Sequence, residues 1–335
     1  MIVFLNGIKG ELMGKIIKKM VIVTVGILLS LLIVIMTISF INHRIQLSQE
    51  SALLQPVGTI VNVNDHLMHV YAEGHNQSPV TLVFMSGGGT SSPVLDFKGL
   101  YSQLSDQYRI AVVEKAGYGN SETASVPRDI DTILEETRSA LSLAGEQGPY
   151  ILFPHSMSGI EALHWAQQYP HEVKSIIGLD PAVPEAYKEY PLPSNMVMKL
   201  TSFAARIGIT RWVPAIADAS AAITEDHLTD DEKDIYRAMF YKNTQTSNMI
   251  EEVRKISSNA AVVSEAGIPD VPMYFFISNG EELPLNDWPN MLISYVEDSP
   301  DGKYMLLDSG HYIHNYETET IANESKIFIK SILEQ

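Results

Sequence analysis

The hydrophobic residues near the N-terminus form one unbroken run. No charged residue lies between Met20 and Ile41. As a helix rising about 1.5 Å per residue, this segment would span roughly 33 Å, which is enough to cross a hydrocarbon core of about 30 Å. The apolar part of a secretory signal is usually only about 7–15 residues long, and no pair of small residues typical of a cleavage site follows Ile41. The run therefore predicts an uncleaved transmembrane anchor at residues 20–41.

The charges beside this run predict its orientation. Lysines precede it at positions 9, 15, 18 and 19, whereas Arg44 alone follows it closely. Basic residues beside a membrane span stay on the cytoplasmic side. We therefore expect a cytoplasmic N-terminus at residues 1–19, a short tether at 42–56, and an extracellular domain at 57–335 in the cell membrane. Cleavage of the segment, which would release a secreted protein, is the alternative.

Beyond the tether, short apolar runs alternate with helical patterns. Residues 58–63 and 66–71 predict a hairpin that turns at Asn64-Asp65. Further strands are predicted at 80–85, 108–114, 150–154, 173–179, 273–277 and 303–307. Segments between them carry apolar residues at the helical period, as at Ile130, Ile133 and Leu134. Apolar strands that alternate with helices indicate a mostly parallel sheet covered on both faces.

The stretch between Asp180 and Pro269 breaks this alternation. It contains no convincing strand, but helical patterns occur at 196–207, 230–241 and 247–266. A crossover between parallel strands needs only about a dozen residues, far fewer than this stretch contains. The excess predicts a helical cap at about 182–268, over one end of the sheet.

Composition removes several classes of function. The chain has no cysteine, which excludes disulfides, thiolate metal sites and a cysteine nucleophile. A net charge of -17 argues against nucleic acid as a partner, because phosphates require a basic surface. His311 and His314 have no apparent third ligand, so no metal site is predicted. No cofactor and no obligate protein partner are inferred, and we expect a small-molecule substrate.

A serine in a tight turn is the first chemical signal. Ser156 lies in Tyr150-Ile-Leu-Phe-Pro-His-Ser-Met-Ser-Gly159, which predicts a strand, a turn and a helix. A serine hydroxyl is a weak nucleophile that needs exposure and a base. The turn of the Gly-x-Ser-x-Gly type gives exposure when the residues two positions away are small, which holds for Ser158 but not for Pro154. Ser158 itself is the poorer nucleophile, because Ile160 would be its bulky neighbour.

Three glycines, Gly87–Gly89, follow an early strand and predict an oxyanion loop. Glycine lets the backbone approach a substrate and direct N–H groups at developing negative charge. We expect another donor from the backbone N–H of Met157, at the start of the helix that follows Ser156. The dinucleotide pattern Gly-x-Gly-x-x-Gly is not met, because its last position is Ser92.

The expected base is His311, directly after the last predicted strand. His314 is the rival, but it lies further into the loop. The base needs a carboxylate that orients it. In hydrolases with a serine turn of this type, the carboxylate lies between the serine and the histidine along the chain. Glu281, after the strand at 273–277, is favoured for this role. The carboxylates that remain open are Glu282, Asp287 and Asp180.

With these residues in place, residues 57–335 resemble the α/β-hydrolase superfamily, in the branch with a helical cap. The resemblance lies in Ser-Gly-Gly-Gly at 86–89, Lys-Ala-Gly-Tyr-Gly-Asn-Ser at 115–121, the serine turn, and Gly310-His311. It implies an eight-stranded, mostly parallel sheet and hydrolysis through an acyl-serine intermediate. It also implies that Gly88 provides the second oxyanion amide.

The resemblance does not identify the substrate, because one fold serves many reactions. A serine in place of aspartate disfavours dehalogenase and epoxide-hydrolase chemistry. We expect cleavage of a carboxylester or a thioester. The alternative enzyme is an aminopeptidase whose acidic cap binds the substrate amine. The alternative outside enzymes is a surface sensor that binds a ligand without turning it over.

Overall fold

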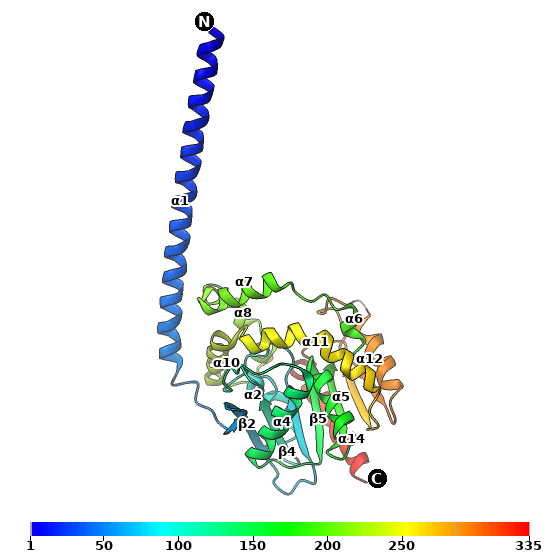
Figure 1. Ribbon diagram of the computed structural model, residues 1–335. Helices are drawn as coiled ribbons and strands as arrows, with labels where there is room; N and C mark the ends of the chain where they lie inside the picture. The colour runs from blue at the N-terminus through cyan, green and yellow to red at the C-terminus, as the bar shows by residue number, and fades with distance from the viewer. Residues whose placement is uncertain (1, 286, 335) are drawn as a thin grey trace.

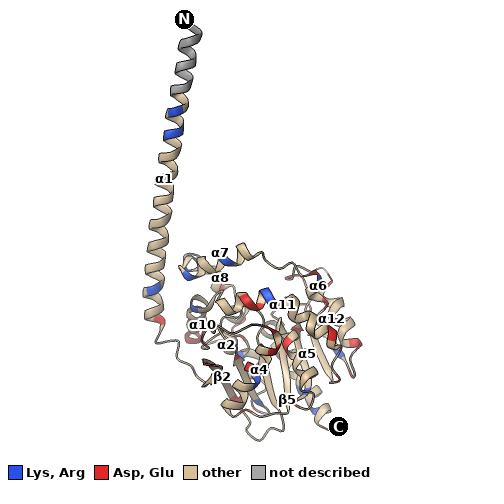
Figure 2. Ribbon diagram, viewed as in Figure 1, with Lys and Arg blue, Asp and Glu red and all other residues tan. Residues whose placement is uncertain are grey.

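Most of one helix, α1 (Ile2–Glu50), extends away from the rest of the chain (Figure 1). The computed structural model describes residues 2–285 and 287–334, with side chains from residue 13 onward. All side chains from Met13 to Ile35 are exposed, and the helix is long and apolar enough to cross a membrane. Figure 2 shows basic residues at both ends of this apolar stretch.

The helix does not end where the tether is predicted. It continues through residues 42–50, so only residues 51–58 link it to the first strand. Residues 42–50 contain neither glycine nor proline. Within them, His43 is buried and accepts a hydrogen bond from Arg211 of the cap region. Residues 42–50 of the predicted tether are therefore helical, and contacts with the cap stabilise these turns.

Eight strands form a single sheet in the order β1-β2-β4-β3-β5-β6-β7-β8. Only β2 runs antiparallel to both of its neighbours, and the pairs from β4 to β8 are parallel. This confirms the eight-stranded, mostly parallel sheet. The strands are β1 (Thr59–Val63), β2 (His66–Gly74), β3 (Thr81–Met85), β4 (Arg109–Glu114), β5 (Tyr150–Ser156), β6 (Val173–Pro181), β7 (Met273–Ile277) and β8 (Lys303–Leu306).

Alternate residues of the inner strands enter two hydrophobic cores. In β7, Met273 and Phe275 belong to one core, whereas Tyr274 and Phe276 belong to the other. This is the period of two expected when both faces of a sheet are buried. The helices of the first core include α4 (Ile130–Ala144), α5 (Ser158–Gln168) and α12 (Trp288–Glu297). The helices of the second include α2 (Pro93–Asp96), α3 (Lys98–Tyr101) and α14 (Thr318–Leu333).

Residues 182–272, all of which the structure describes, contain helices and no strand. We call them the cap. Their elements are α6 (Ala186–Glu189), α7 (Asn195–Arg206), the 3-10 helix η1 (Ile209–Trp212), α8 (Ala215–Asp218), α9 (Ala221–Thr224), α10 (Asp230–Asn243) and α11 (Ser247–Ala266). Buried Glu252 of α11 pairs with Lys115 and Arg128 at 2.9 Å each, which ties the cap to the sheet domain.

Candidate active site

Ser156 lies at the end of β5, two residues before α5 begins at Ser158. Its backbone φ is 54°, a left-handed conformation that costs free energy for a residue other than glycine. It is the only residue of β5 that is not buried. The following helix can pack closely because residue 159 is glycine: a Cβ there would lie 2.3 Å from the carbonyl oxygen of Ala182. The turn therefore presents the Ser156 side chain at the edge of the sheet.

Ser158, the other serine of this turn, is buried. Its Oγ lies 2.6 Å from the carbonyl oxygen of Met85 and 2.9 Å from that of His155. The hydroxyl thus connects the end of β3 to the serine turn. Its position fits a structural role and agrees with the preference for Ser156 as nucleophile.

The glycine loop after β3 lies directly against this turn. A Cβ on Gly87 would lie 2.9 Å from Cβ of Ser156, and a Cβ on Gly88 would lie 3.0 Å from Cε of Met157. Gly88 and Met157, the two expected oxyanion donors, therefore lie close together beside the serine. The close approach at Gly87 leaves no room for a side chain.

A buried tyrosine of the 115–121 motif holds the glycine loop. The hydroxyl of Tyr118 accepts a hydrogen bond from N–H of Gly89 at 3.4 Å and donates one to Glu252 at 2.7 Å. Burial, together with the charge of Glu252, raises the pKa of Tyr118 well above its ordinary value. The phenol therefore stays protonated and can donate to Glu252 at physiological pH. The sequence motif marks this segment, but the contact with cap residue Glu252 is visible only in the structure.

His311 lies after β8, in a nearly buried position. Its Nδ1 is 2.5 Å from Oδ2 of Asp180, which follows Leu179 at the end of β6 and is fully buried. A carboxylate on Nδ1 favours the tautomer whose Nε2 is free to accept a proton. Asp180 is thus the carboxylate that orients His311.

Asp180 itself is held by the next strand. Its Oδ1 accepts hydrogen bonds from N–H of Ser278 at 3.0 Å and from Nε1 of Trp288 at 2.9 Å. Its Oδ2 accepts a further bond from Oγ of Ser278 at 2.7 Å. These donors satisfy the buried carboxylate and fix its orientation. The φ of Asp180 is 50°, so this residue also adopts an uncommon backbone conformation.

The acid favoured from the sequence, Glu281, does not contact His311. It is exposed, and the interaction at that residue is a hydrogen bond from its backbone N–H to Asn279. The preference for Glu281 was wrong because acids at the ends of two strands reach the same edge of the sheet. Ser278 hydrogen-bonds to Asp180, and it is Asp180 that reaches the histidine. Glu282 lies closer: its carboxylate accepts the backbone N–H of His311 at 2.8 Å and so holds the histidine loop.

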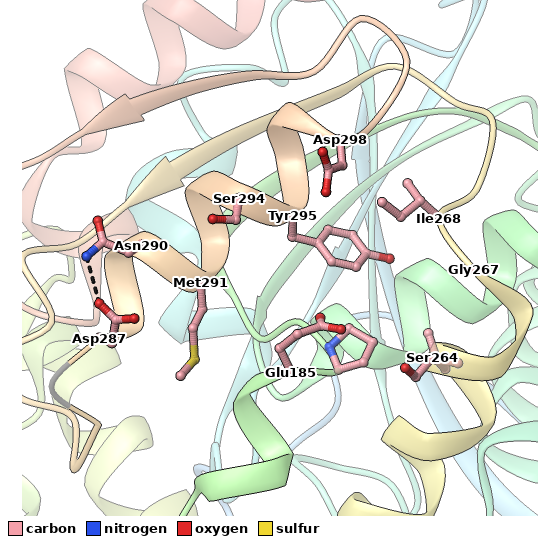
Figure 3. A pocket seen from close by; sticks show the side chains of 12 residues that line it. Glu185, Ser264, Gly267, Ile268, Asp287, Asn290, Met291, Ser294, Tyr295 and Asp298 are labelled. Carbon is pink, nitrogen blue, oxygen red and sulfur yellow. Dashed lines mark hydrogen bonds between the residues drawn. The ribbon is translucent and has the colours of Figure 1, made fainter.

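Asp287, another open candidate, lies elsewhere. Figure 3 shows it hydrogen-bonded to Asn290 beside a cavity of about 390 Å³, and the bond measures 2.7 Å. Residues of α11 and α12 line this cavity, and neither Ser156 nor His311 is among them. Asp287 therefore does not join the serine and histidine.

Two further histidines lie behind the site. His155 is buried, its Nε2 is 3.1 Å from the carbonyl oxygen of His311, and its ring packs 4.5 Å from that of His314. Burial, reinforced by His314 and His311, holds the pKa of His155 well below 6.5. His314, the rival base, pairs instead with buried Asp96 at 3.0 Å. Neither His155 nor His314 contacts Asp180.

Ser156 and His311 line the same cavity, which has a volume of about 180 Å³. Gly87 and Gly88 form another part of its wall, and Tyr187 and Tyr190 of the cap also line it. The serine hydroxyl, a histidine paired with a carboxylate and a glycine loop thus converge on one space. Among the described residues, no three His, Asp or Glu side chains are grouped so that they could hold a metal ion.

Comparison with known proteins agrees with this geometry. Residues 80–318 match the family model described as the alpha/beta hydrolase fold. The chain belongs to the α/β-hydrolase fold family. It is 43% identical over 236 residues to an uncharacterised Bacillus subtilis protein, YbdG, covering 70% of this chain and 72% of that one. A second uncharacterised B. subtilis protein, YqjL, is 29% identical over 147 residues, 44% of this chain and 56% of that one.

Solved α/β-hydrolase structures share the fold at low identity. An enol-lactonase from Burkholderia xenovorans has a TM-score of 0.62 and 13% identity, covering 83% of this chain and all of its own. An epoxide hydrolase from Vigna radiata has a TM-score of 0.64 and 17% identity, covering 82% of this chain and 97% of its own. Family membership supports hydrolase activity on a small molecule.

Proposed function

We propose that this α/β-hydrolase is a membrane-anchored serine hydrolase that cleaves a carboxylester or thioester through an acyl-serine intermediate. Ser156 is the nucleophile, His311 the general base and Asp180 the orienting acid. The backbone N–H groups of Met157 and Gly88 form the oxyanion hole. The observation that carries the proposal is the pairing of His311 with Asp180 in the cavity that Ser156 also lines.

In the first half-reaction, Oγ of Ser156 attacks the substrate carbonyl carbon while Nε2 of His311 takes the hydroxyl proton. Asp180 stabilises the imidazolium that forms. The carbonyl oxygen becomes an oxyanion and accepts hydrogen bonds from Met157 and Gly88. When the tetrahedral intermediate collapses, His311 returns the proton to the departing alcohol or thiol. Ser156 then carries the acyl group as an ester.

In the second half-reaction, a water molecule attacks the acyl carbon and gives its proton to His311. A second tetrahedral intermediate forms in the same oxyanion hole. The bond to Oγ of Ser156 breaks, His311 protonates Oγ, and the carboxylic acid leaves. The cycle requires no group beyond this chain's residues and water.

Labelling with a fluorophosphonate tests this proposal. The reagent phosphonylates only an activated serine, so we expect the full-length protein to be labelled at Ser156. Ser156→Ala should abolish labelling, and Asp180→Asn should slow it strongly, whereas Glu281→Gln should label at the wild-type rate. Absent labelling of the folded protein, or equal labelling of Ser156→Ala, would exclude the serine mechanism and leave a binding sensor.

The anchor is the second part of the proposal. The exposed apolar stretch of α1, with lysines before it and Arg44 after it, supports a single span with a cytoplasmic N-terminus. The catalytic domain then lies outside the cell. A C-terminally tagged chain should remain in the membrane fraction after alkaline washing, and intact cells should expose the tag to added protease. A tagged fragment in the medium would favour a cleaved signal instead.

An aminopeptidase-like activity is the second candidate. A cavity of about 310 Å³ shares Thr90 and Tyr312 with the catalytic cavity, and its lining includes two acids, Asp96 and Glu282, and no Lys or Arg. Oδ1 of buried Asp96 has no hydrogen-bond partner and could accept one from a substrate ammonium. Acyl esters assayed beside aminoacyl amides discriminate between the two: faster cleavage of the amides, lost in Asp96→Asn, would favour the peptidase.

A further inference from the structure

The cap and the proposed anchor helix are joined by a specific set of hydrogen bonds. Oγ of Ser39 donates to the carbonyl oxygen of Ile207 at 2.7 Å and accepts from Nε1 of Trp212 at 2.9 Å. One helical turn further along α1, Nδ1 of His43 accepts from Nε of Arg211 at 2.9 Å. These contacts fix how far along α1 the cap lies.

A two-fold hydrogen-bonded ion pair reinforces this junction. The guanidinium of Arg211 donates to both carboxylate oxygens of Glu50, at 2.7 and 2.6 Å. The side chain of Arg211 is 9% exposed and that of Glu50 is 19% exposed, so water screens the pair weakly. On α1, residues 36, 39, 43, 46, 47 and 50 are the partly or fully buried ones from Met36 onward. They lie on one face of the helix, which is therefore a built interface with the cap.

The position of the junction along α1 indicates where the cap lies relative to the membrane. Ser39 lies in the last turn of the apolar segment 20–41. If that segment spans the bilayer, as proposed above, the backbone of Ile207 and the ring of Trp212 lie where hydrocarbon gives way to headgroups. Figure 1 shows α7 and α8 along the edge of the domain from which the rest of α1 rises.

The helix at this edge exposes an apolar stripe. In α7, Met196, Val197, Leu200 and Phe203 are 72%, 49%, 60% and 48% exposed, at spacings that place them on one face. The opposite face is buried on the protein through Met198, Ser202 and Ala205. A contiguous exposed apolar face marks an interaction surface.

The segment after α7 extends this surface. Trp212, Val213 and Ile216 are each at least half exposed, although Trp212 also hydrogen-bonds to α1. An indole with an apolar ring and a polar N–H is typical of membrane–water interfaces. We define the docking face as the exposed apolar side chains of residues 196–216.

Charge identifies what the docking face contacts. The chain has 40 acidic and 23 basic residues, yet no acid lies between Glu189 and Asp218. Lys199 and Arg206 flank the apolar stripe of α7, and both are exposed. An apolar face with a basic border is the composition of a helix that lies in the interface of an anionic membrane.

We infer that the docking face lies on the bilayer that α1 spans and inserts its apolar side chains between anionic lipids. This inference rests on the proposed anchor. Ile216 of the docking face also lines the 310 Å³ cavity beside the catalytic cavity. Docking therefore places one wall of that cavity at the membrane surface, where an amphiphilic acyl substrate is concentrated.

Environment-sensitive labels on single cysteines test the inference, because the chain has no native cysteine. Three full-length variants, Val34→Cys, Leu200→Cys and Ile327→Cys, are labelled and reconstituted in vesicles of phosphatidylcholine and phosphatidylglycerol with brominated acyl chains. Val34 reports the span and Leu200 the docking face. Ile327 is a matched control, since it is 64% exposed in α14 on the far edge of the domain.

We expect bromine to quench the labels at positions 34 and 200 at least twice as strongly as the label at 327. Quenching at 34 but not at 200 would overturn docking and leave the anchor intact. Quenching at neither would overturn both. Quenching at 200 alone would mean that the domain binds the membrane although α1 does not span it, and would overturn the dependence on α1.

Charge reversal tests the lipid preference separately. With the label at position 200, Lys199→Glu combined with Arg206→Glu should lower the quenching at least two-fold in phosphatidylglycerol-containing vesicles. The same quenching in both proteins would overturn the role of anionic headgroups. Because both residues are exposed, ester turnover by the variant in detergent should be unchanged, which controls for folding.

Discussion

Asp180 and His311 are joined by a hydrogen bond of 2.5 Å between Oδ2 and Nδ1, although they lie 131 positions apart in the chain. Parallel strands bring them together, since β6 and the loop after β8 reach the same edge of the sheet. Ser278 and Trp288 hold the carboxylate from the other side. The acid is therefore preorganised before any substrate arrives.

Replacing Asp180 should remove most of the activity while leaving the fold in place. In Asp180→Asn the amide can donate to Nδ1 and thereby favour the wrong tautomer of His311. We expect kcat for ester hydrolysis to fall by roughly 10³–10⁴-fold. Glu281→Gln, which alters an exposed acid without contact to His311, should retain kcat within about two-fold. Equal losses in the two variants would contradict the assignment of Asp180.

The glycine loop offers a matched pair of substitutions. Gly87→Ala would set a Cβ 2.9 Å from Cβ of Ser156 and 3.2 Å from the carbonyl oxygen of His155, neither of which can move freely. The loop should shift and weaken one oxyanion contact, lowering kcat by about 10²-fold. In Gly88→Ala the nearest atom is the flexible end of Met157, so we expect a smaller loss. Steady-state kinetics of both variants checks this order, which a reversed ranking would refute.

The buried ion network should dominate the stability of the cap. Glu252→Ala would leave buried Lys115 without its partner and Arg128 paired with Glu136 alone, at a cost of about 3–5 kcal/mol in the free energy of unfolding. Glu251→Ala, on the same turn, breaks a half-exposed pair with Arg254 and should cost at most about 1 kcal/mol. Urea unfolding in detergent measures both. Similar costs would mean that the network does not hold the cap.

His155 predicts a loss of stability in acid. The pKa of this buried histidine is well below 6.5 in the folded protein, so below about pH 6.5 the unfolded chain binds a proton that the folded chain does not. The free energy of unfolding should therefore decrease as the pH is lowered, by up to about 1.4 kcal/mol per pH unit from this residue. Urea unfolding from pH 7 to pH 5 should show a steeper fall for the wild type than for His155→Gln. Parallel slopes would contradict a neutral His155.

The inner strands of the sheet could be predicted from the sequence because they are apolar on both faces. The predicted segments at 80–85 and 273–277 match β3 and β7 to within a residue at each end. The predicted turn at Asn64-Asp65 has φ of 48° and 64°, the two left-handed residues of a tight hairpin. Periodicity within one segment is enough for such elements.

The partner of His311 could not be predicted in this way. Asp180, near the end of β6, and Glu281, after β7, lie at the ends of strands that reach the same edge of the sheet, so chain order leaves them equivalent. The difference comes from Ser278 and Trp288, which supply hydrogen bonds to Asp180 from the strand and helix that follow the cap. The extra turns of α1 escaped prediction for a similar reason, because His43 and Glu50 are held by Arg211, far away in the chain.

Trapping the covalent intermediate tests the proposed reaction most directly. Full-length protein is mixed with p-nitrophenyl acetate, quenched in acid during the first turnover, digested and analysed by mass spectrometry. The account predicts an acetyl group on Ser156, and not on Ser158, that forms together with the burst of p-nitrophenol and disappears as substrate is exhausted. Steady turnover without an acetylated Ser156, or with the same rate in Ser156→Ala, would contradict it.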